Sequence, residues 1–248
     1  MPRYDQHFLR NSVYAVKIAE AVCPQAGEKI LEVGPGRGAL TRYLLQKGVP
    51  YIGIEIDSVC LKSLEELPSK ASTEWILGDF LRIALPEEPL FFVSNLPYSI
   101  SGPAIFRILS HHRYIRAGVV MLQAEVAQRL YAKAGKRPYG RLSVLFQSVY
   151  EVKRLCRVPP NAFTPPPKVW SEVVLFERKA LLSSEVWEDF VGFVRRAFRQ
   201  PRRKLAKNLS DYRLSISPFF SHRRPHELSV EEFFELWRIL RNDIMLDG

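Results

Sequence analysis

The stretch Lys29-Ile-Leu-Glu-Val-Gly-Pro-Gly-Arg-Gly38 joins a short apolar strand to a glycine-rich turn. Glycines let a backbone turn tightly and approach a ligand without a Cβ in the way. The turn stands at the carboxyl end of the first strand, which is where open α/β sheets bind their ligands. The stretch therefore predicts an α/β fold with a ligand site beside its first strand.

Strand and helix patterns alternate on both sides of this stretch. Further strands are predicted at 50–56, 75–77, 90–94 and 117–122, and helices at 13–22, 39–46, 59–67, 104–111 and 124–133. Such alternation indicates βαβ units and a mainly parallel sheet. Strand patterns at 150–158 and 172–178 predict a terminal hairpin, and helical patterns at 184–199 and 229–241 predict a small α-helical C-terminal domain. The expected division is an α/β domain over 1–180 and a helical domain over 181–248.

The bulk composition is that of a soluble globular protein, with 47% hydrophobic and 25% charged residues. The three cysteines, Cys23, Cys60 and Cys156, form no CxxC or Cys/His cluster, which argues against a disulfide framework or a zinc site. No apolar run approaches the roughly 18 residues that cross a bilayer, and the N-terminus lacks a signal-peptide pattern. We expect a cytoplasmic protein with no metal and no membrane partner.

The net charge of +10 is concentrated in two stretches of the chain. Residues 107–168 hold twelve Lys or Arg and two acids, and residues 195–207 hold seven basic residues and no acid. Concentrated positive charge attracts polyanions, and counterion release adds affinity. This pattern favours nucleic-acid binding, although a solvated surface that only maintains solubility has the same composition.

The glycine spacing predicts which ligand the turn binds. Dinucleotide sites need GxGxxG, whereas here the spacing is GxGxG from Gly34 through Gly36, with Glu32 two residues before the first glycine. An acid at this place repels a diphosphate and suits a cation such as the sulfonium of S-adenosylmethionine. Glu55 ends the second strand, where a carboxylate accepts ribose hydroxyls, and Asp79 follows the third, within reach of an adenine amino group. Taken alone, each of these two acids is better explained as a strand-end cap or a surface charge, but the recurrence of acids at the ends of three successive strands indicates a cofactor site.

The tetrad Asn95-Leu-Pro-Tyr98 follows the fourth predicted strand. The lone pair of an adenine N6 is delocalised, so the amine is a poor nucleophile. The Asn95 amide oxygen and a backbone carbonyl could accept its two N–H groups and aim the lone pair at a methyl group. Pro97 stiffens the backbone, and Tyr98 offers a ring on which an extruded base stacks. The alternative is a strand-end turn with a half-buried tyrosine.

These segments resemble the small-subunit ribosomal RNA adenine N6-dimethyltransferases of the bacterial KsgA type. The matching segments span nearly the whole chain: Gln6–Leu9, Glu32–Gly38, Ile54–Asp57, Gly78–Phe80, Asn95–Ser101, Tyr139–Ser143, Pro159–Val169 and Ala197–Leu205. The resemblance implies the class I methyltransferase fold, a Rossmann-like seven-stranded sheet with helices on both faces. Its first part is shared by all class I methyltransferases.

The resemblance also implies roles for single residues. It places His7, Leu9, Gly34, Gly36, Glu55, Asp79 and Asn95 around S-adenosylmethionine. It implies that Asn95, the Leu96 backbone, Pro97 and Tyr98 hold the target base, and that Phe163 stacks on its opposite face. The implied substrate is two adjacent adenosines in the 3′-terminal hairpin loop of 16S rRNA within a 30S assembly particle, each receiving two methyl groups. We expect the enzyme to act as a monomer in small-subunit biogenesis.

Three residues depart from the family pattern. Asp5 stands where glycine is usual, His7 where asparagine is common, and Trp170 where a small or acidic residue is usual. Trp170 is expected in the core, and an exposed Trp170 in contact with RNA is the alternative.

A basic segment near the C-terminus interleaves cations with apolar residues, which suits a helical pair with one face toward the core and one toward phosphates. The cations expected to bind the ribosomal RNA backbone are Arg195, Arg196, Arg199, Arg202, Arg203, Lys204 and Lys207.

Several other functions remain open from the sequence. A resistance-type methyltransferase acting on 23S rRNA shares the glycine motif and a similar tetrad. A DNA adenine methyltransferase is a further alternative, although its tetrad more often starts with aspartate. A non-catalytic ribosome assembly or nucleic-acid-binding factor on the same fold is the alternative from a different class, against which the intact acids and tetrad argue.

Overall fold

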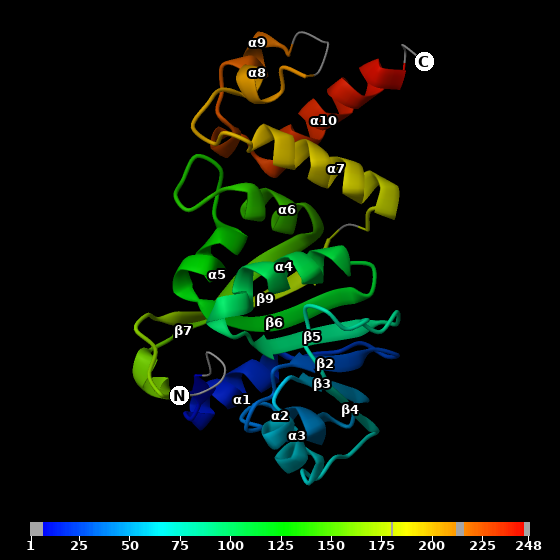
Figure 1. Ribbon diagram of the computed structural model, residues 1–248, viewed down its shortest axis with the longest axis vertical. Helices are drawn as coiled ribbons and strands as arrows, with labels where there is room; N and C mark the ends of the chain where they lie inside the picture. Colours follow the sequence, from blue (N-terminus) through cyan, green and yellow to red (C-terminus); the bar gives the residue numbers. More distant parts are fainter. Residues whose placement is uncertain (1–6, 180, 212–215, 246–248) are drawn as a thin grey trace. The chain divides into compact units, whose positions relative to one another are not determined.

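A seven-stranded sheet in the order β4-β3-β2-β5-β6-β9-β7 is the centre of the N-terminal part of the computed structural model, which describes residues 7–179, 181–211 and 216–245 (Figure 1). Its strands are β2 (Lys29–Val33), β3 (Tyr51–Glu55), β4 (Thr73–Leu77), β5 (Leu90–Asn95), β6 (Ile115–Gln123), β7 (Tyr150–Val158) and β9 (Ser171–Arg178). The five strands from β4 to β6 are parallel, and β9 is antiparallel to β6. The predicted mainly parallel α/β sheet is confirmed.

The strand order explains where a ligand binds. From β2 the chain moves outward through β3 to β4 and then returns to β5 on the other side of β2. Ligands of open α/β sheets bind at such a switch point, beyond the carboxyl ends of the strands. The register brings Val33 beside Ser94 and Glu55 beside Leu77, so the ends of these strands lie at one edge of the sheet.

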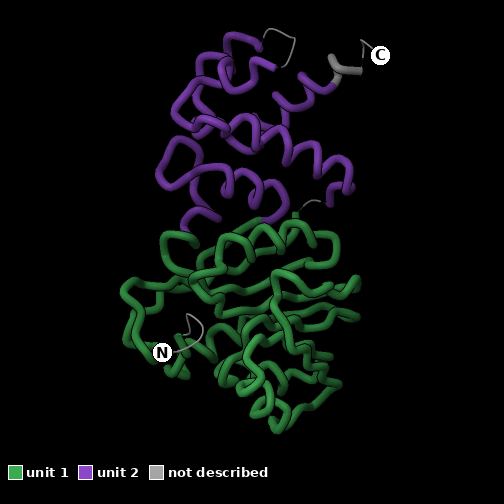
Figure 2. The backbone as a smooth tube through the Cα atoms, in the orientation of Figure 1, with its two compact units in different colours: residues 1–127, 151–179 green, residues 128–150, 180–248 purple. Residues whose placement is uncertain are grey.

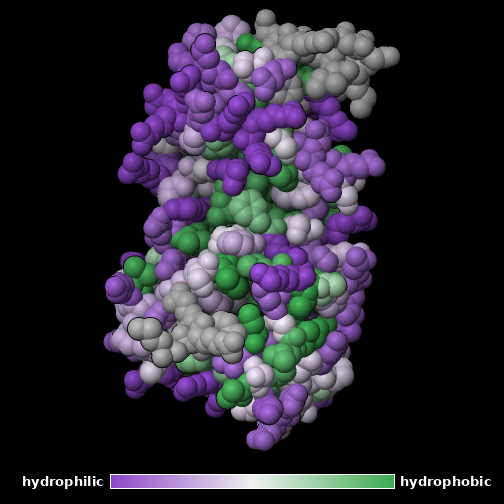
Figure 3. Space-filling view, in the orientation of Figure 1, coloured by the Kyte–Doolittle hydropathy of each residue, from purple (hydrophilic) through white to green (hydrophobic). Residues whose placement is uncertain are grey.

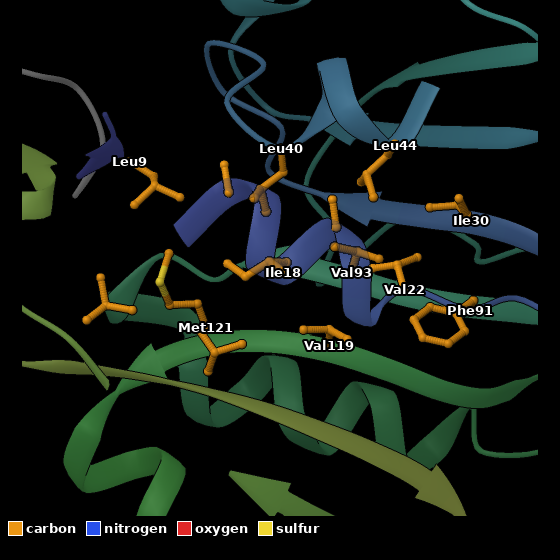
Figure 4. Close-up of a cluster of buried hydrophobic side chains, with 14 of the residues drawn as sticks. Leu9, Ile18, Val22, Ile30, Leu40, Leu44, Phe91, Val93, Val119 and Met121 are labelled. Atoms are coloured by element: carbon orange, nitrogen blue, oxygen red, sulfur yellow. The ribbon is translucent and has the colours of Figure 1, made fainter. Parts of the chain in front are cut away.

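One face of the sheet is covered by α1 (Ser12–Ala21), with α2 (Thr41–Leu44) and the 3-10 turn Leu45–Lys47 in the same cluster of buried side chains. Ile18 and Val22 lie over Phe91, Val93 and Val119 (Figure 4). Alternate residues of a strand point to opposite faces, so β5 and β6 supply one set of side chains to this cluster. The sheet is therefore buried on this side.

The opposite face is covered by α4 (Ser101–Ser110). Phe92 points away from the cluster just described, and its ring lies 5.8 Å from that of Phe80 and 6.5 Å from that of Phe176. The guanidinium of Arg107, from α4, lies 5.7 Å from the Phe80 ring. Helices therefore cover both faces, as the fold class requires. The remaining helices of this region are α3 (Ser58–Glu65) and α5 (Ala124–Tyr131).

A second, two-stranded sheet joins the N-terminal segment to a distant loop. In it β1 (Phe8–Leu9) pairs antiparallel with β8 (Phe163–Thr164), which follows the 3-10 turn Pro160–Ala162. The Arg10 N–H donates to the Ala162 carbonyl at 2.9 Å, which extends the pairing. The loop between β7 and β9 is thereby fixed beside the N-terminal segment.

The chain divides into two compact units, residues 1–127 with 151–179 (unit 1) and residues 128–150 with 180–248 (unit 2) (Figure 2). Unit 2 contains α6 (Arg141–Val149), α7 (Ser184–Ala197), α8 (Leu205–Asn208), α9 (Pro218–Ser221), the 3-10 turn Pro225–Glu227 and α10 (Val230–Met245). Phe190 stacks on Phe234 with 4.2 Å between ring centroids and meets Trp237 edge-on. The assignment of cofactor binding and RNA binding to separate domains at residue 180 stays a prediction.

Trp170 lies at the surface, with 45% of its side chain exposed, so the prediction that it is a core residue is wrong. Asp5, which also departs from the family pattern, lies outside the described residues, as does Gln6.

None of the helices in the described part of the chain has the length and apolar character of a membrane span. Among the same residues, no three His, Cys, Asp or Glu side chains are grouped as metal ligands.

Candidate active site

The glycine-rich turn after β2 adopts backbone angles that glycine takes most readily. Gly34, Gly36 and Gly38 have φ values of +68°, +56° and +76°, in the left-handed region. A Cβ at Gly36 would lie 3.1 Å from the ring of Phe8. The Gly34 N–H donates to the Ile54 carbonyl at 2.9 Å and ties the turn to β3. The turn is therefore fixed at the edge where the neighbouring strands end.

Glu55 connects the end of β3 to the glycine turn and is 3% exposed. Its Oε2 accepts the Gly36 N–H at 2.8 Å, and its Oε1 accepts the N–H groups of Ile56 and Asp57 at 2.9 and 3.0 Å. A carboxylate has about four acceptor positions. Glu55 therefore holds the turn in place and still has capacity to accept a hydroxyl of a ligand.

Glu32 lies beneath the same turn and is 1% exposed. The Tyr51 hydroxyl donates to its Oε2 at 2.6 Å. Burial raises the pKa of Glu32 to about 7, and the Tyr51 hydrogen bond only partly offsets this. Because burial disfavours the charged form, a cation bound nearby would favour ionisation of Glu32. This electrostatic coupling agrees with the expectation that the acid suits a cationic ligand.

Asp79 follows β4 at the same edge of the sheet. Its Oδ1 accepts the Leu81 N–H at 2.9 Å, and its Oδ2 lies 3.4 Å from the Nε of Arg82. The local turn therefore fixes the Asp79 carboxylate, while its side chain remains 34% exposed and accessible to a ligand.

Asn95 is the last residue of β5, and its side chain is oriented by the N-terminal segment. The Nδ2 of Asn95 donates to the backbone carbonyl of His7 at 3.2 Å. Leu96 donates its N–H to the Met121 carbonyl at 3.1 Å, which continues the pairing of β5 with β6. With Nδ2 engaged by a main-chain oxygen, the amide presents Oδ1 as an acceptor.

Tyr98 begins the 3-10 turn Tyr98–Ile100, and both its hydroxyl and its ring are held. Its hydroxyl lies 2.7 Å from the Oγ of Ser171, at the start of β9. Its ring centroid lies 5.2 Å from that of His7, whose Nδ1 lies 2.7 Å from the Pro165 carbonyl oxygen. Two segments distant in sequence therefore fix the orientation of this ring.

A cavity of about 410 Å³ brings these groups together in unit 1. Its volume lies in the range of small-molecule sites. The structure places ten sequence-predicted residues in its lining: His7, Leu9, Gly34, Gly36, Glu55, Asp79, Asn95, Leu96, Pro97 and Tyr98. The cavity therefore presents carboxylates, an amide and an aromatic ring to one ligand space.

Phe163 is the predicted residue that the structure does not bring into this lining. Its side chain is 2% exposed and packs in the core cluster with Leu9 and Ile18. The stacking role of Phe163 against a base stays a prediction.

Sequence reasoning missed several contributors to the site. Ser171, the partner of the Tyr98 hydroxyl, carries no local signal because it lies 73 residues away in the chain. Ile56 also lines the cavity and is 42% exposed, which is high for an isoleucine. Its place directly after Glu55 is the one signal that the sequence offers for it. Phe8, Arg37 and Phe80 are among the other lining residues that were not predicted.

The predicted RNA-binding cations lie in unit 2, from the end of α7 to α8, and all seven are exposed: Arg195, Arg196, Arg199, Arg202, Arg203, Lys204 and Lys207. Ala197, Phe198 and Leu205, between them, are buried. The Asn208 side chain bonds both the N–H and the carbonyl of Gln200, at 3.1 and 3.0 Å, which fixes the turn that carries the cations. Much of the visible surface of unit 2 is hydrophilic (Figure 3).

Comparison with known protein families gives a match over most of the chain. The family model described as "Ribosomal RNA adenine dimethylase" matches residues 1–218. The chain is 39% identical over 237 residues to a probable ribosomal RNA small subunit methyltransferase A of Pyrobaculum islandicum, covering 95% of this chain and 94% of the relative. It is 37% identical over 246 residues to the ribosomal RNA small subunit methyltransferase A of Flavobacterium johnsoniae, covering 96% and 94%.

Two solved structures resemble the chain over nearly its full length. A dimethyladenosine transferase from Plasmodium falciparum superposes with a TM-score of 0.80 at 25% identity, covering 95% of this chain and 98% of that one. The 23S rRNA methyltransferase ErmE superposes with a TM-score of 0.71 at 25% identity, covering 94% and 99%. A dimethyladenosine transferase and a 23S rRNA methyltransferase therefore share this fold.

Proposed function

The chain belongs to the ribosomal RNA adenine dimethylase family, and from this premise we propose that it transfers methyl groups from S-adenosylmethionine to N6 of two adjacent adenosines in 16S rRNA. The proposed site is the 3′-terminal hairpin loop within a 30S assembly particle, and the product is N6,N6-dimethyladenosine. The proposal includes a role in small-subunit biogenesis as a cytoplasmic monomer.

The observation that carries this proposal is the convergence of Glu55, Asp79 and Asn95 on one cavity. The three residues end or follow different strands, and only the parallel topology brings them together. The small-subunit assignment draws on the curated relatives, which are named for that subunit.

The side chains of the cavity suit S-adenosylmethionine. Glu55 has capacity to accept a ribose hydroxyl, and Asp79 can accept an adenine amino group. Buried Glu32 favours a nearby cation, and the glycine turn keeps Cβ atoms away from the ligand at Gly34 and Gly36. When bound, the cofactor supplies an electrophilic methyl group on a sulfonium.

Asn95 and the backbone of Leu96 orient the target amine in the proposed mechanism. The Asn95 Oδ1 accepts one N6–H, since its Nδ2 is held by the His7 carbonyl. The Leu96 side chain is buried, so this residue reaches the cavity through its main chain, where its carbonyl accepts the second N6–H. Both bonds favour a pyramidal nitrogen whose lone pair faces the methyl group, and alignment of this kind supplies much of the rate.

Pro97 and Tyr98 position the base itself. Proline fixes the backbone at φ −55° between the strand and the turn. The Tyr98 ring, fixed through Ser171 and His7, offers a flat surface for the extruded adenine. As the new N–C bond forms and the C–S bond breaks, the nitrogen becomes positively charged and readily releases a proton to water. A strong general base is therefore not required.

The proposed substrate is tested with labelled S-adenosylmethionine and ribosomal particles that lack the modification. We expect label to enter 30S particles and nucleoside analysis to give N6,N6-dimethyladenosine, because the relatives are small-subunit enzymes. Label in 50S particles instead would support the 23S alternative, which the ErmE likeness keeps relevant. Binding without any transfer would support the non-catalytic assembly factor.

Reversing the charge of Arg202, Arg203 and Lys204 to glutamate is expected to weaken RNA binding about tenfold or more. These exposed cations would bind phosphates, which position the RNA without reading its bases. Each lost contact to a single strand flattens the slope of log K against log salt by roughly 0.7. Three lost contacts therefore flatten it by about 2, which titrations at several salt concentrations would measure.

The control for this experiment reverses three exposed lysines of unit 1, Lys17, Lys62 and Lys70, which changes the net charge by the same amount. If the control loses as much affinity as the test variant, the effect is one of overall charge. An unchanged salt slope in the test variant would also contradict the proposed contact.

A further inference from the structure

Trp170 is an exposed tryptophan held in place by a cation. Its side chain is 45% exposed, and the Arg157 guanidinium carbon lies 4.9 Å from its ring centroid. The preceding residue, Val169, is 44% exposed. Large apolar side chains gathered at a surface commonly mark an interaction site, and nothing in the proposed chemistry of the cavity uses this one.

The topology places Trp170 beside the residues that hold the target base. Because β9 runs antiparallel to β6, its first residue, Ser171, pairs with Gln123 at the end of β6. The Trp170 carbonyl accepts the Ala124 N–H at 2.9 Å. The next residue, Ser171, contacts the hydroxyl of Tyr98. Trp170 is therefore the sequence neighbour of Ser171, the residue that holds the Tyr98 hydroxyl, and all three residues belong to unit 1.

The surroundings of Trp170 are positively charged. Glu172 is fully buried, and its Oε1 lies 3.4 Å from the Nε of Arg157 and 3.8 Å from the Nη1 of Arg154. Both arginine side chains remain about half exposed. Residues 152–170 contain four cations, which include the exposed Lys168, and no acid. The buried Glu172 carboxylate thus orients two guanidinium groups, and the exposed part of each remains available to bind an anion.

We infer that Trp170 is a stacking platform for an unpaired base next to the target adenosine, with Arg154, Arg157 and Lys168 facing the adjoining phosphates. An aromatic ring beside cations is the combination that binds single-stranded nucleic acid, because every base has a flat face and every linkage a charge. Hairpin loops present such unstacked bases. An acidic protein would also pair with these cations, but RNA is the proposed substrate of the neighbouring cavity and brings both a base and a phosphate to this surface. The inference rests on the proposed function, since it takes RNA as the substrate of the neighbouring cavity.

The test combines Trp170→Ala with a hairpin RNA in which the nucleotide on either side of the target adenosine is abasic. For the parent protein, one of these abasic RNAs is expected to bind about tenfold more weakly than the intact RNA. For Trp170→Ala, the intact RNA is expected to bind about tenfold more weakly than to the parent, with no further loss on the abasic RNA. Trp170→Phe keeps a flat ring and should restore most of the affinity, whereas Trp170→Leu keeps an apolar side chain without a ring and should not.

Val13→Ala is the matched control, because it shortens an exposed apolar side chain of unit 1 that lies on α1, away from the Trp170 surface. Its RNA affinity is expected to stay within twofold of the parent, with thermal unfolding of each variant as the check on folding. An equal penalty for the abasic RNA in parent and Trp170→Ala would overturn the inference. So would a loss that appears with 30S particles but not with the isolated hairpin, since it would indicate a protein contact.

The binding measurements need no methyl transfer, so they distinguish this inference from the proposed function. If the parent methylates neither particle yet the abasic penalty depends on Trp170, stacking holds and the catalytic proposal fails. If the parent dimethylates 30S particles and KM is unchanged in Trp170→Ala, the catalytic proposal holds and stacking is refuted.

Discussion

Replacing Asn95 by alanine is expected to lower kcat for methyl transfer at least about 100-fold while leaving RNA affinity within twofold. The substitution removes the proposed acceptor of an N6–H and with it the alignment of the amine. Loss of one preorganised hydrogen-bonding group at a reacting centre typically costs 10²–10³ in kcat. Single-turnover transfer of labelled methyl groups and fluorescence anisotropy with the hairpin RNA would measure the two quantities separately.

Two further variants define the role of Asn95. Asn95→Asp keeps an acceptor oxygen but loses the N–H that bonds the His7 carbonyl, so we expect an activity between those of the parent and the alanine variant. Gln46→Ala removes an exposed amide that bonds the Pro68 carbonyl and should leave kcat unchanged. Full activity of Asn95→Ala would refute the proposed catalytic role.

Replacing Glu55 by alanine is expected to weaken S-adenosylmethionine binding by about 100-fold or more. The change removes the proposed partner of a ribose hydroxyl and also the acceptor that fixes the Gly36 N–H. Hydrogen bonds to a charged group contribute about 1.5–3 kcal/mol each, and 1.4 kcal/mol corresponds to a factor of ten in Kd. Loss of the bond to the hydroxyl, together with loss of the contact that holds the glycine turn, accounts for the expected decrease in affinity, which isothermal titration calorimetry would measure.

Glu55→Gln separates charge from shape at this position. The amide has one oxygen in place of two, so one set of backbone N–H groups, from Gly36 or from Ile56 and Asp57, would face another donor. We therefore expect a loss of affinity even though the side chain keeps its size. Glu74→Gln, on the neighbouring strand β4 and exposed, is the control. Parental affinity in Glu55→Ala would exclude Glu55 as a cofactor ligand.

The strand-end residues of the site are predictable from sequence because their signal is local. Glu55 and Asn95 end apolar strands, and Asp79 follows one closely. Once the alternation of strands and helices indicates a parallel sheet, the carboxyl ends must share an edge. This pattern alone therefore predicts that Glu55, Asp79 and Asn95 line one site.

Contacts between distant segments are not predictable in the same way. Asn95 bonds a main-chain carbonyl at His7, 88 residues away, and a main-chain group leaves no trace in the residue type. The burial of Phe163 and the exposure of Trp170 are equally hidden. Three prolines at 165–167 interrupt the strand pattern between them, so no regular alternation fixes which side chains point inward.

Asn95 is held by the main-chain carbonyl of His7, so this contact does not depend on which side chain stands at position 7. Any residue at position 7 can provide this contact, because the acceptor is a main-chain oxygen that every amino acid carries. Preparations trimmed past this point would keep an intact sheet yet lose part of their reaction centre. The leading segment is therefore expected to support catalysis through its main chain as well as through the His7 ring, and truncation would remove both contributions.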